Sequence, residues 1–227
     1  MFMVFISYSI YSYILIRQKR NHEYKSCNKK KSMEEFNKLY RQEKYKSCNK
    51  KPIEEFNKLY QMKDEIGRGG FGTVFSAIRL QDKTKVAIKE IYKAYTHIKK
   101  TSDGSIPLEI VIMEQLKSVP GVINIIDWYE MPESFFIVME WCSKDLDAFL
   151  NEQDILNEVQ AEIQARLFFK QLVTIVQMVH NNGIFHGDIK NNNIVINCDT
   201  KQIKLIDFGC SKYLHNNFYH TFNGSDK

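Results

Sequence analysis

A short polar stretch, His186-Gly187-Asp188-Ile189-Lys190-Asn191-Asn192-Asn193, carries residue types suited to phosphoryl transfer. This reaction needs little covalent chemistry from a protein, but it needs charges placed around a nucleotide–metal complex. Asp188 can accept the proton of an attacking hydroxyl group, and Lys190 can offset charge on the moving phosphoryl group. Asn193 and Asp207, the latter in Leu205-Ile206-Asp207-Phe208-Gly209, offer the oxygen ligands that Mg2+ prefers.

The two segments together form the pattern H-x-D-x-K-x-x-N followed by D-F-G, which is typical of protein kinases. Each half alone is short enough to occur by chance, and the alternative interpretation is a polar turn before a β-hairpin. Apolar runs at residues 194–196 and 203–206 predict strands that accompany the second motif. The order and the strands favour the catalytic interpretation.

A glycine-rich segment, Gly67-Arg68-Gly69-Gly70-Phe71-Gly72-Thr73-Val74, lies between strand-like runs at residues 60–66 and 74–79. A lone G-x-G-x-x-G also occurs in dinucleotide sites, but there the glycines precede a helix rather than a strand. Glycines let the backbone approach phosphates closely and turn tightly. We therefore expect a nucleotide loop formed by Gly67, Gly69, Gly70, Phe71 and Gly72, with Val74 over the adenine.

Lys89 ends the strand-like run Val86-Ala87-Ile88-Lys89, and it can project toward the α- and β-phosphates. Taken alone it would be a solvated strand lysine, but after the glycine loop the functional interpretation is favoured. A loop at residues 101–104 precedes a predicted helix, residues 107–116, which begins at Pro107. Glu109 on this helix is the expected ion-pair partner of Lys89, and Glu114 is the competing choice.

Residues 134–140 predict a buried strand that ends in a linker, Glu140-Trp141-Cys142-Ser143. Backbone groups of this linker could pair with adenine, and Met139 would set the depth of the pocket. Besides the glycine loop, the predicted nucleotide contacts are Val74, Ala87, Lys89, Met139, Glu140, Cys142 and Asp145.

The strongest helix signal runs from Asn157 to Asn182, with a capping box of Asn157 and Gln160 and with Gly183 at its end. Apolar residues recur on one face at helical spacing, which predicts a core-facing stripe rather than a cofactor site. This stripe consists of Val159, Ile163, Leu167, Phe168, Leu172, Ile175, Val176 and Val179.

The charge of the chain is divided unevenly along its 227 residues. Residues 1–60 hold 14 Lys and Arg against 6 Asp and Glu, whereas residues 61–227 hold 18 against 21. There is no zinc-ligand spacing and no arginine stripe with interleaved aromatics, so we expect no nucleic-acid partner. Five cysteines without a C-x-x-C pair fit reduced thiols in the cytoplasm.

The N-terminal region contains an apolar segment, residues 1–20, and a basic duplicated segment, residues 21–60. The apolar run, residues 1–16, is short for a membrane span, and its charges follow it rather than precede it. A membrane anchor that leaves the rest in the cytosol remains the alternative to cytoplasmic localisation. Glu-Glu-Phe-Asn-Lys-Leu-Tyr occurs at residues 34–40 and again at 54–60. The repeat is either a basic docking segment or, as we favour, a solvated, weakly helical linker.

Taken together, these motifs resemble a protein serine/threonine kinase, and they look most like the Pim family. Pim-like features are Pro107-Leu108-Glu109, Gly121-Val122-Ile123 with Asp127-Trp128-Tyr129-Glu130, the Leu205–Gly209 motif and Thr221-Phe222-Asn223-Gly224. The resemblance covers about residues 55–227. It implies an α+β, two-lobed fold with a complete β-rich lobe (residues 61–140), a partial helical lobe (residues 141–227), and ATP and Mg2+ between them. It also implies phosphorylation of Ser and Thr of protein substrates, and we expect the protein to be a monomer.

The chain departs from the family pattern in three places. Gly187 stands where the family has an arginine that usually pairs with a phosphorylated activation loop, so we expect no such control. Asn191-Asn192 replaces an acidic pair, which puts a preference for arginine-rich substrates in doubt. The sequence ends at Lys227, inside the activation segment, which leaves three hypotheses: an active kinase, a nucleotide-binding fragment or decoy with little activity, and a membrane-tethered interaction protein.

Overall fold

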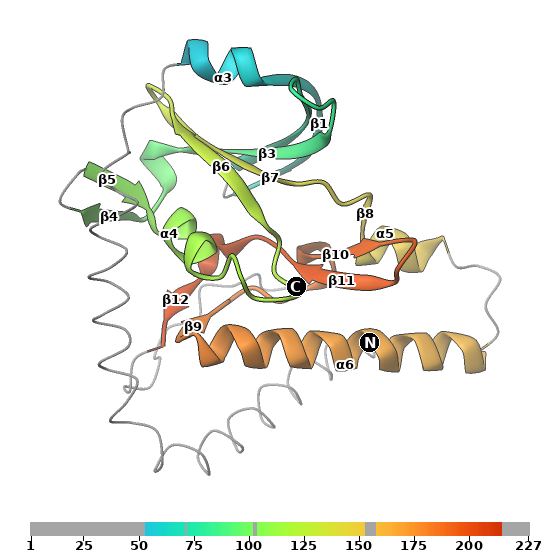
Figure 1. Ribbon diagram of the computed structural model, residues 1–227. Helices are drawn as coiled ribbons and strands as arrows, with labels where there is room; N and C mark the ends of the chain where they lie inside the picture. The colour runs from blue at the N-terminus through green and yellow to red at the C-terminus, as the bar shows by residue number, and fades with distance from the viewer. Residues whose placement is uncertain (1–52, 71, 102–103, 153–157, 215–227) are drawn as a thin grey trace. The chain divides into compact units, whose positions relative to one another are not determined.

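The computed structural model describes residues 53–70, 72–101, 104–152 and 158–214 (Figure 1). The apolar segment, the first copy of the repeat, Phe71 and the Thr221–Gly224 motif lie outside these ranges. The described residues of 53–99 and 105–214 belong to one compact unit. Within the described ranges, no helix combines the length and the apolar character needed to cross a bilayer.

The first half of this unit is an antiparallel sheet with the strand order β1-β2-β3-β7-β6. Its strands are β1 (Tyr60–Gly69), β2 (Gly72–Arg79), β3 (Lys85–Tyr92), β6 (Ile125–Glu130) and β7 (Ser134–Glu140). Ala77, Val86, Ile88 and Val138 are fully buried in its core. Strands β1, β2, β3 and β7 cover the runs from which the sequence predicted strands, whereas β6 was not predicted.

A short helix, α3 (Ile53–Leu59), agrees with the expected weakly helical linker, but its buried side chains correct the expectation that this segment is solvated. Phe56 is 2 % exposed, and its ring centroid lies 5.2 Å from that of Tyr129 and 5.1 Å from that of Phe136. Tyr60 contacts both Phe56 and Tyr129. We call these four residues the aromatic cluster. The second copy of the repeat thus supplies core side chains, and the sheet lobe includes residues 53–60.

Between β3 and β6 the chain forms η2 (Lys93–Tyr95), β4 (Ile98–Thr101), β5 (Gly104–Pro107) and α4 (Leu108–Gln115). β4 and β5 make a two-stranded sheet, so Thr101 and Gly104 of the predicted loop belong to strands. Pro107, the expected first residue of the helix, is the N-cap residue of α4, so the helix begins one position later, at Leu108. The missing N–H of proline costs nothing there, because the first turn of a helix leaves its N–H groups unbonded.

The second half of the unit follows the linker after β7. Its helices are α5 (Leu146–Asn151), α6 (Glu158–Asn181), η3 (Asn191–Asn193) and η4 (Phe208–Cys210). Its strands are β8 (Lys144–Asp145), β9 (Ile184–Phe185), β10 (Ile194–Asn197), β11 (Gln202–Leu205) and β12 (Lys212–Tyr213). They form two small sheets, β11-β10-β8 and β12-β9 (Figure 1). The architecture agrees with the predicted α+β class, with a sheet lobe and part of a helical lobe.

The apolar stripe of α6 is only partly buried, which corrects the prediction of one continuous core face. Its C-terminal half, Phe168, Leu172, Ile175, Val176 and Val179, is at most 5 % exposed. Ile163 and Leu167, in its N-terminal half, are 55 % and 57 % exposed. Gly183 follows the helix with φ +75°, and its N–H donates to His180 O at 2.8 Å. Asn157, the predicted cap, lies outside the described ranges.

Candidate active site

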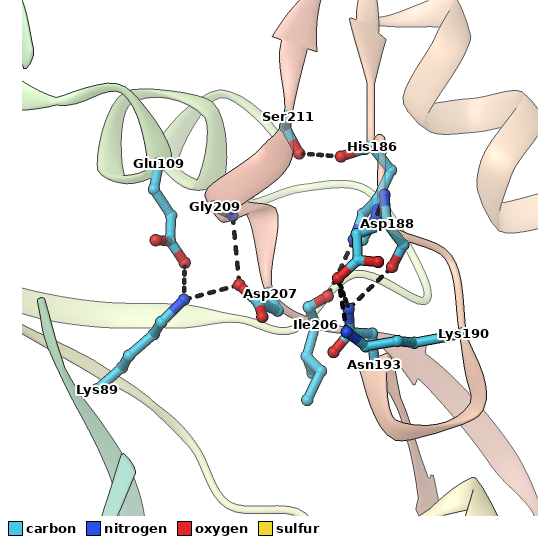
Figure 2. A network of polar contacts seen from close by, with 10 residues as sticks. All are labelled: Lys89, Glu109, His186, Asp188, Lys190, Asn193, Ile206, Asp207, Gly209 and Ser211. Atoms are coloured by element: carbon cyan, nitrogen blue, oxygen red, sulfur yellow. Dashed lines mark hydrogen bonds and ion pairs between the residues drawn. The ribbon is translucent and has the colours of Figure 1, made fainter. Parts of the chain in front are cut away.

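Lys89 lies between two carboxylates that come from distant parts of the chain (Figure 2). Its Nζ is 2.7 Å from Glu109 Oε1 on α4 and 2.7 Å from Asp207 Oδ1, which follows β11. The side chains of Lys89 and Glu109 are 7 % and 5 % exposed, whereas Asp207 is 25 % exposed. The structure thus contains the Lys89–Glu109 ion pair expected from the sequence, while Glu114 instead approaches Lys117.

Burial and charge act against each other on the pKa values of this cluster. Burial alone would lower the pKa of Lys89, but the carboxylates of Glu109 and Asp207 raise it above its usual range. Burial raises the pKa of Glu109, and the Lys89 ammonium offsets only part of this. Burial also opposes ionisation of Asp207, yet Lys89 and the N–H of Gly209 hold its pKa below the usual value. Lys89 is therefore charged and Asp207 ionised at neutral pH.

The register of the sheet brings four predicted nucleotide contacts onto one face. Lys89 on β3 lies opposite Val74 on β2, and Ala87, two residues earlier, lies opposite Met139 on β7. Directly opposed residues, and residues two apart on a strand, project to the same side of a sheet. Val74, Ala87, Lys89 and Met139 therefore share the face that carries the ion pair.

The loop after β9 holds Asp188 in a defined position (Figure 2). Asp188 is 6 % exposed, and its Oδ2 accepts from Lys190 Nζ at 2.8 Å and from Asn193 Nδ2 at 2.9 Å. Asn193 Nδ2 also donates to the backbone carbonyl of Asp188 at 2.8 Å. Because the amide nitrogen of Asn193 faces Asp188, the Oδ1 atom of Asn193 points away from Asp188. The three residues predicted from their spacing are thus in direct contact.

His186 links this loop to the segment that carries Asp207. Its Nδ1 accepts from the N–H of Asp188 at 3.3 Å, so its Nε2 carries the proton and donates to Ile206 O at 2.9 Å. Its ring packs edge-on against Phe208, with centroids 4.8 Å apart. Burial lowers the pKa of His186 and favours this neutral form. His186 therefore positions both acidic residues without carrying charge itself.

Gly187 is required by the geometry of the loop. Its φ is +86°, and a Cβ atom there would lie 2.7 Å from Cys210 O. Ser211 Oγ donates to His186 O at 3.0 Å, and β12 pairs with β9 just beyond. The segment after Asp207 therefore packs closely on the backbone of the catalytic loop. Sequence reasoning noted the missing arginine at 187 but missed this contact, because Cys210 lies 23 positions away.

The glycine loop and the linker complete the candidate nucleotide site. A Cβ atom at Gly67, Gly69 or Gly70 would meet nothing within 4 Å, so their side of the loop is open. Gly72 has φ +133°, and a Cβ there would lie 2.0 Å from Glu90 O, so only glycine fits between β2 and β3.

In the linker, burial and the charge of Glu140 raise the pKa of Cys142 to about 11, so its thiol is protonated. Asp145 caps α5, because its Oδ1 accepts from Ala148 N at 2.7 Å. This contact explains Asp145 structurally, and its contact with a nucleotide stays a prediction.

Comparison with known proteins agrees with this geometry. The protein kinase domain family matches residues 60–227. This chain belongs to the protein kinase family. Its two-lobed, kinase-like fold is thereby confirmed, and members of the family generally use ATP and Mg2+.

Several serine/threonine-protein kinases are similar to the chain. Prk-2 of Caenorhabditis elegans is 37% identical over 169 residues, which cover 73% of this chain and 37% of the relative. Pim-2 of Danio rerio is 38% identical over 180 residues, 73% of this chain and 56% of the relative. NUAK family SNF1-like kinase 1 of Homo sapiens is 36% identical over 169 residues, 73% of this chain and 24% of the relative. The chain thus spans only part of the length of these relatives.

Proposed function

We propose that this protein transfers the γ-phosphate of ATP to serine or threonine hydroxyls of protein substrates. The observation that carries the proposal is the contact of Lys89 with both Glu109 and Asp207, next to a buried Asp188 held by Lys190 and Asn193. A buried lysine with two carboxylates is costly to desolvate, so it points to a site rather than to a stabilising element.

The residues of the chain suit distinct steps of this reaction. Asp188 Oδ2 accepts from Lys190 and Asn193, and these contacts hold the carboxylate in place to take the proton of the substrate hydroxyl. The hydroxyl oxygen forms a bond to the γ-phosphorus as the bond to the bridging oxygen breaks, and ADP leaves. Lys89 holds the α- and β-phosphates, and Lys190 offsets charge on the transferred group.

The donor set also fits Mg2+. A carboxylate oxygen of Asp207 and Oδ1 of Asn193 are hard oxygen ligands, and Mg2+ binds through one or two such groups plus substrate phosphates and water. The ion would neutralise charge that develops on the phosphate oxygens. Asp207 and Asn193 would hold it, and Lys89 would keep Asp207 ionised.

Within the family we place the protein closest to the Pim kinases, as a cytoplasmic monomer. The Pim-like motifs of the sequence and the similarity to prk-2 and pim-2 support the first part. Among the described residues, Cys142 and Cys198 are thiols outside any disulfide, which fits a reducing compartment. Besides the four residues on the sheet face, the proposed contacts to ATP come from the glycine loop and the linker. They are Gly67, Gly69, Gly70, Gly72, Glu140 and Cys142.

The test separates nucleotide binding from transfer. Millimolar Mg-ATP should raise the melting temperature of residues 1–227, because a ligand that binds only the folded state stabilises it. Asp207→Asn should remove most of the Mg2+-dependent part of the shift. Radiolabelled phosphate from ATP should then appear on a Ser/Thr peptide but not on its Ala counterpart. A folded sample without any shift would contradict nucleotide binding, and a shift without transfer would favour the nucleotide-binding alternative.

A further inference from the structure

The carboxylate of Glu140, at the end of β7, joins three segments of the chain. Its Oε1 accepts from Lys204 Nζ on β11 at 2.5 Å and from the backbone N–H of Asn124 at 2.6 Å. The backbone N–H of Glu140 in turn donates to Asn124 O at 3.0 Å. One side chain in the adenine linker therefore contacts both the loop after α4 and the strand that precedes Asp207.

The loop after α4 continues this network toward the metal-binding residues. Leu205 N donates to Gly121 O at 2.8 Å, and Ile123 N donates to Leu205 O at 3.0 Å. One residue further, Ile206 N donates to Asn193 O at 2.9 Å. A path of hydrogen bonds therefore runs from the linker to Asn193, and Lys204 joins the linker to the same strand directly.

We propose that Glu140 and Lys204 are positioning residues that keep the adenine linker in register with Asp207 and Asn193. This inference rests on the proposed function, since it concerns the two ends of one nucleotide site. Charge-assisted hydrogen bonds are stronger and more directional than neutral ones, and two donors on one oxygen define its place. Misplacement of about 1 Å in such a site can cost about 100-fold in rate. The linker would set where adenine lies, and the Glu140–Lys204 contact would set where the phosphates then meet Asp207.

The chain offers a matched control for this ion pair. Lys204 and Glu140 have side chains that are 30 % and 29 % exposed. Lys93 and Glu130 form a second pair, 2.8 Å apart, with side chains that are 32 % and 29 % exposed. This control pair joins η2 to β6 and touches neither the linker nor β11. Lys204→Met and Lys93→Met therefore remove the same charge from the same degree of burial.

The decisive measurement is the ratio of two dissociation constants, that of adenosine and that of Mg-ATP, by calorimetry. Adenosine reports the linker and the adenine contacts of the sheet face, whereas Mg-ATP also reports Lys89, Asp207 and Asn193. Lys204→Met should lower this ratio about three- to tenfold, as expected for loss of a half-exposed charged contact. Lys204→Arg should restore the ratio, and Lys93→Met should leave it unchanged. An equal loss for both ligands would mean a purely structural role and would overturn the proposal, as would no loss at all.

A second measurement does not depend on nucleotide. Amide hydrogen exchange at Asn124, Leu205 and Ile206 should accelerate in Lys204→Met but not in Lys93→Met. A charge swap, Glu140→Lys with Lys204→Glu, should not restore protection, because a lysine at 140 cannot accept from Asn124 N–H. If the wild type bound neither ligand, the proposed function would fail while exchange still tested the coupling. Unchanged exchange in Lys204→Met, or full recovery in the swap, would overturn the proposed network.

Discussion

The described residues contain two buried clusters that are opposite in character. The aromatic cluster, Phe56, Tyr60, Tyr129 and Phe136, gains free energy from removing apolar surface from water and from edge-on ring contacts. The charged cluster of Lys89, Glu109 and Asp207 must instead recover the cost of desolvating three ions. The first cluster is therefore expected to control stability, and the second to control chemistry.

The largest loss of turnover without a loss of stability should come from Asp188→Asn in the catalytic loop. The variant keeps the shape of the side chain and can still contact Asn193, but it cannot take up the substrate proton. Turnover should fall by about 100- to 10,000-fold, the usual contribution of a general base. Mg-ATP affinity and the free energy of unfolding should change little. Steady-state transfer assays beside calorimetric titration check this, and a comparable loss of nucleotide affinity would contradict the role of Asp188.

Phe56→Ala in the aromatic cluster should give the reverse result, a loss of stability without a loss of Mg-ATP affinity. Truncation of a fully buried phenylalanine leaves a cavity and costs about 3–5 kcal/mol of stability. Urea unfolding measures the loss, and Mg-ATP affinity at a temperature where the variant is folded should remain near wild type. Ile53→Ala on the same helix, 52 % exposed, is the matched control and should cost far less. Equal costs for both variants would mean that α3 is not part of the core.

The charged cluster and the neighbouring catalytic loop could be predicted because their chemistry restricts residue types and local spacing. Asp188, Lys190 and Asn193 lie within six positions, and Asp207 is marked by the Phe-Gly pair that follows it. The alternation of β3 then placed Lys89 on the right face. Physical constraints of the reaction were thus readable without any knowledge of the fold.

Packing was much harder to predict. Phe56 was assigned to a solvated, weakly helical linker, because the charged composition of the repeat gives no sign that one face of its helix is buried. Ile163 and Leu167 share the periodicity of α6 with buried residues, but periodicity shows a shared face and not what covers it. The contact between Glu140 and Lys204 spans 64 positions, and only the assembled sheets bring the two together.

A smaller effect is expected at His180, which lies outside both clusters and whose titratable ring stacks on Phe185. Burial, together with the nearby His186, lowers the pKa of His180 to about 4. Above pH 6.5, His180 is neutral in both the folded and the unfolded state. Between pH 6.5 and pH 4, His180 takes up a proton only in the unfolded state. Stability should therefore fall by about 2 kcal/mol from pH 7 to pH 5. Urea unfolding at both pH values checks this, and His180→Gln should flatten the dependence. An unchanged slope in the variant would assign the effect to His186 or to other groups.

The smallest expected effect tests whether the charged cluster is rigid because of its backbone. Gly187→Ala would place a Cβ 2.7 Å from Cys210 O, at a φ of +86° that costs other residues about 1–2 kcal/mol. The Cys210 carbonyl must then move, and it belongs to the segment that carries Asp207. We expect a loss of about 1–2 kcal/mol in stability, together with a larger loss of Mg-ATP affinity than of adenosine affinity.

The glycine at 187 thus separates two explanations of how the segment after Asp207 is held. If close backbone packing holds it, Gly187→Ala should accelerate amide exchange at Cys210, Ser211 and Lys212, and phosphatase treatment of the wild type should change nothing. Gly72→Ala is a control of greater steric severity, since its Cβ would meet Glu90 O in the sheet lobe even more closely. It should destabilise β2 and β3 without affecting exchange at residues 210–212. If phosphatase loosened residues 210–212 while Gly187→Ala did not, an attached phosphate rather than the glycine contact would hold the segment.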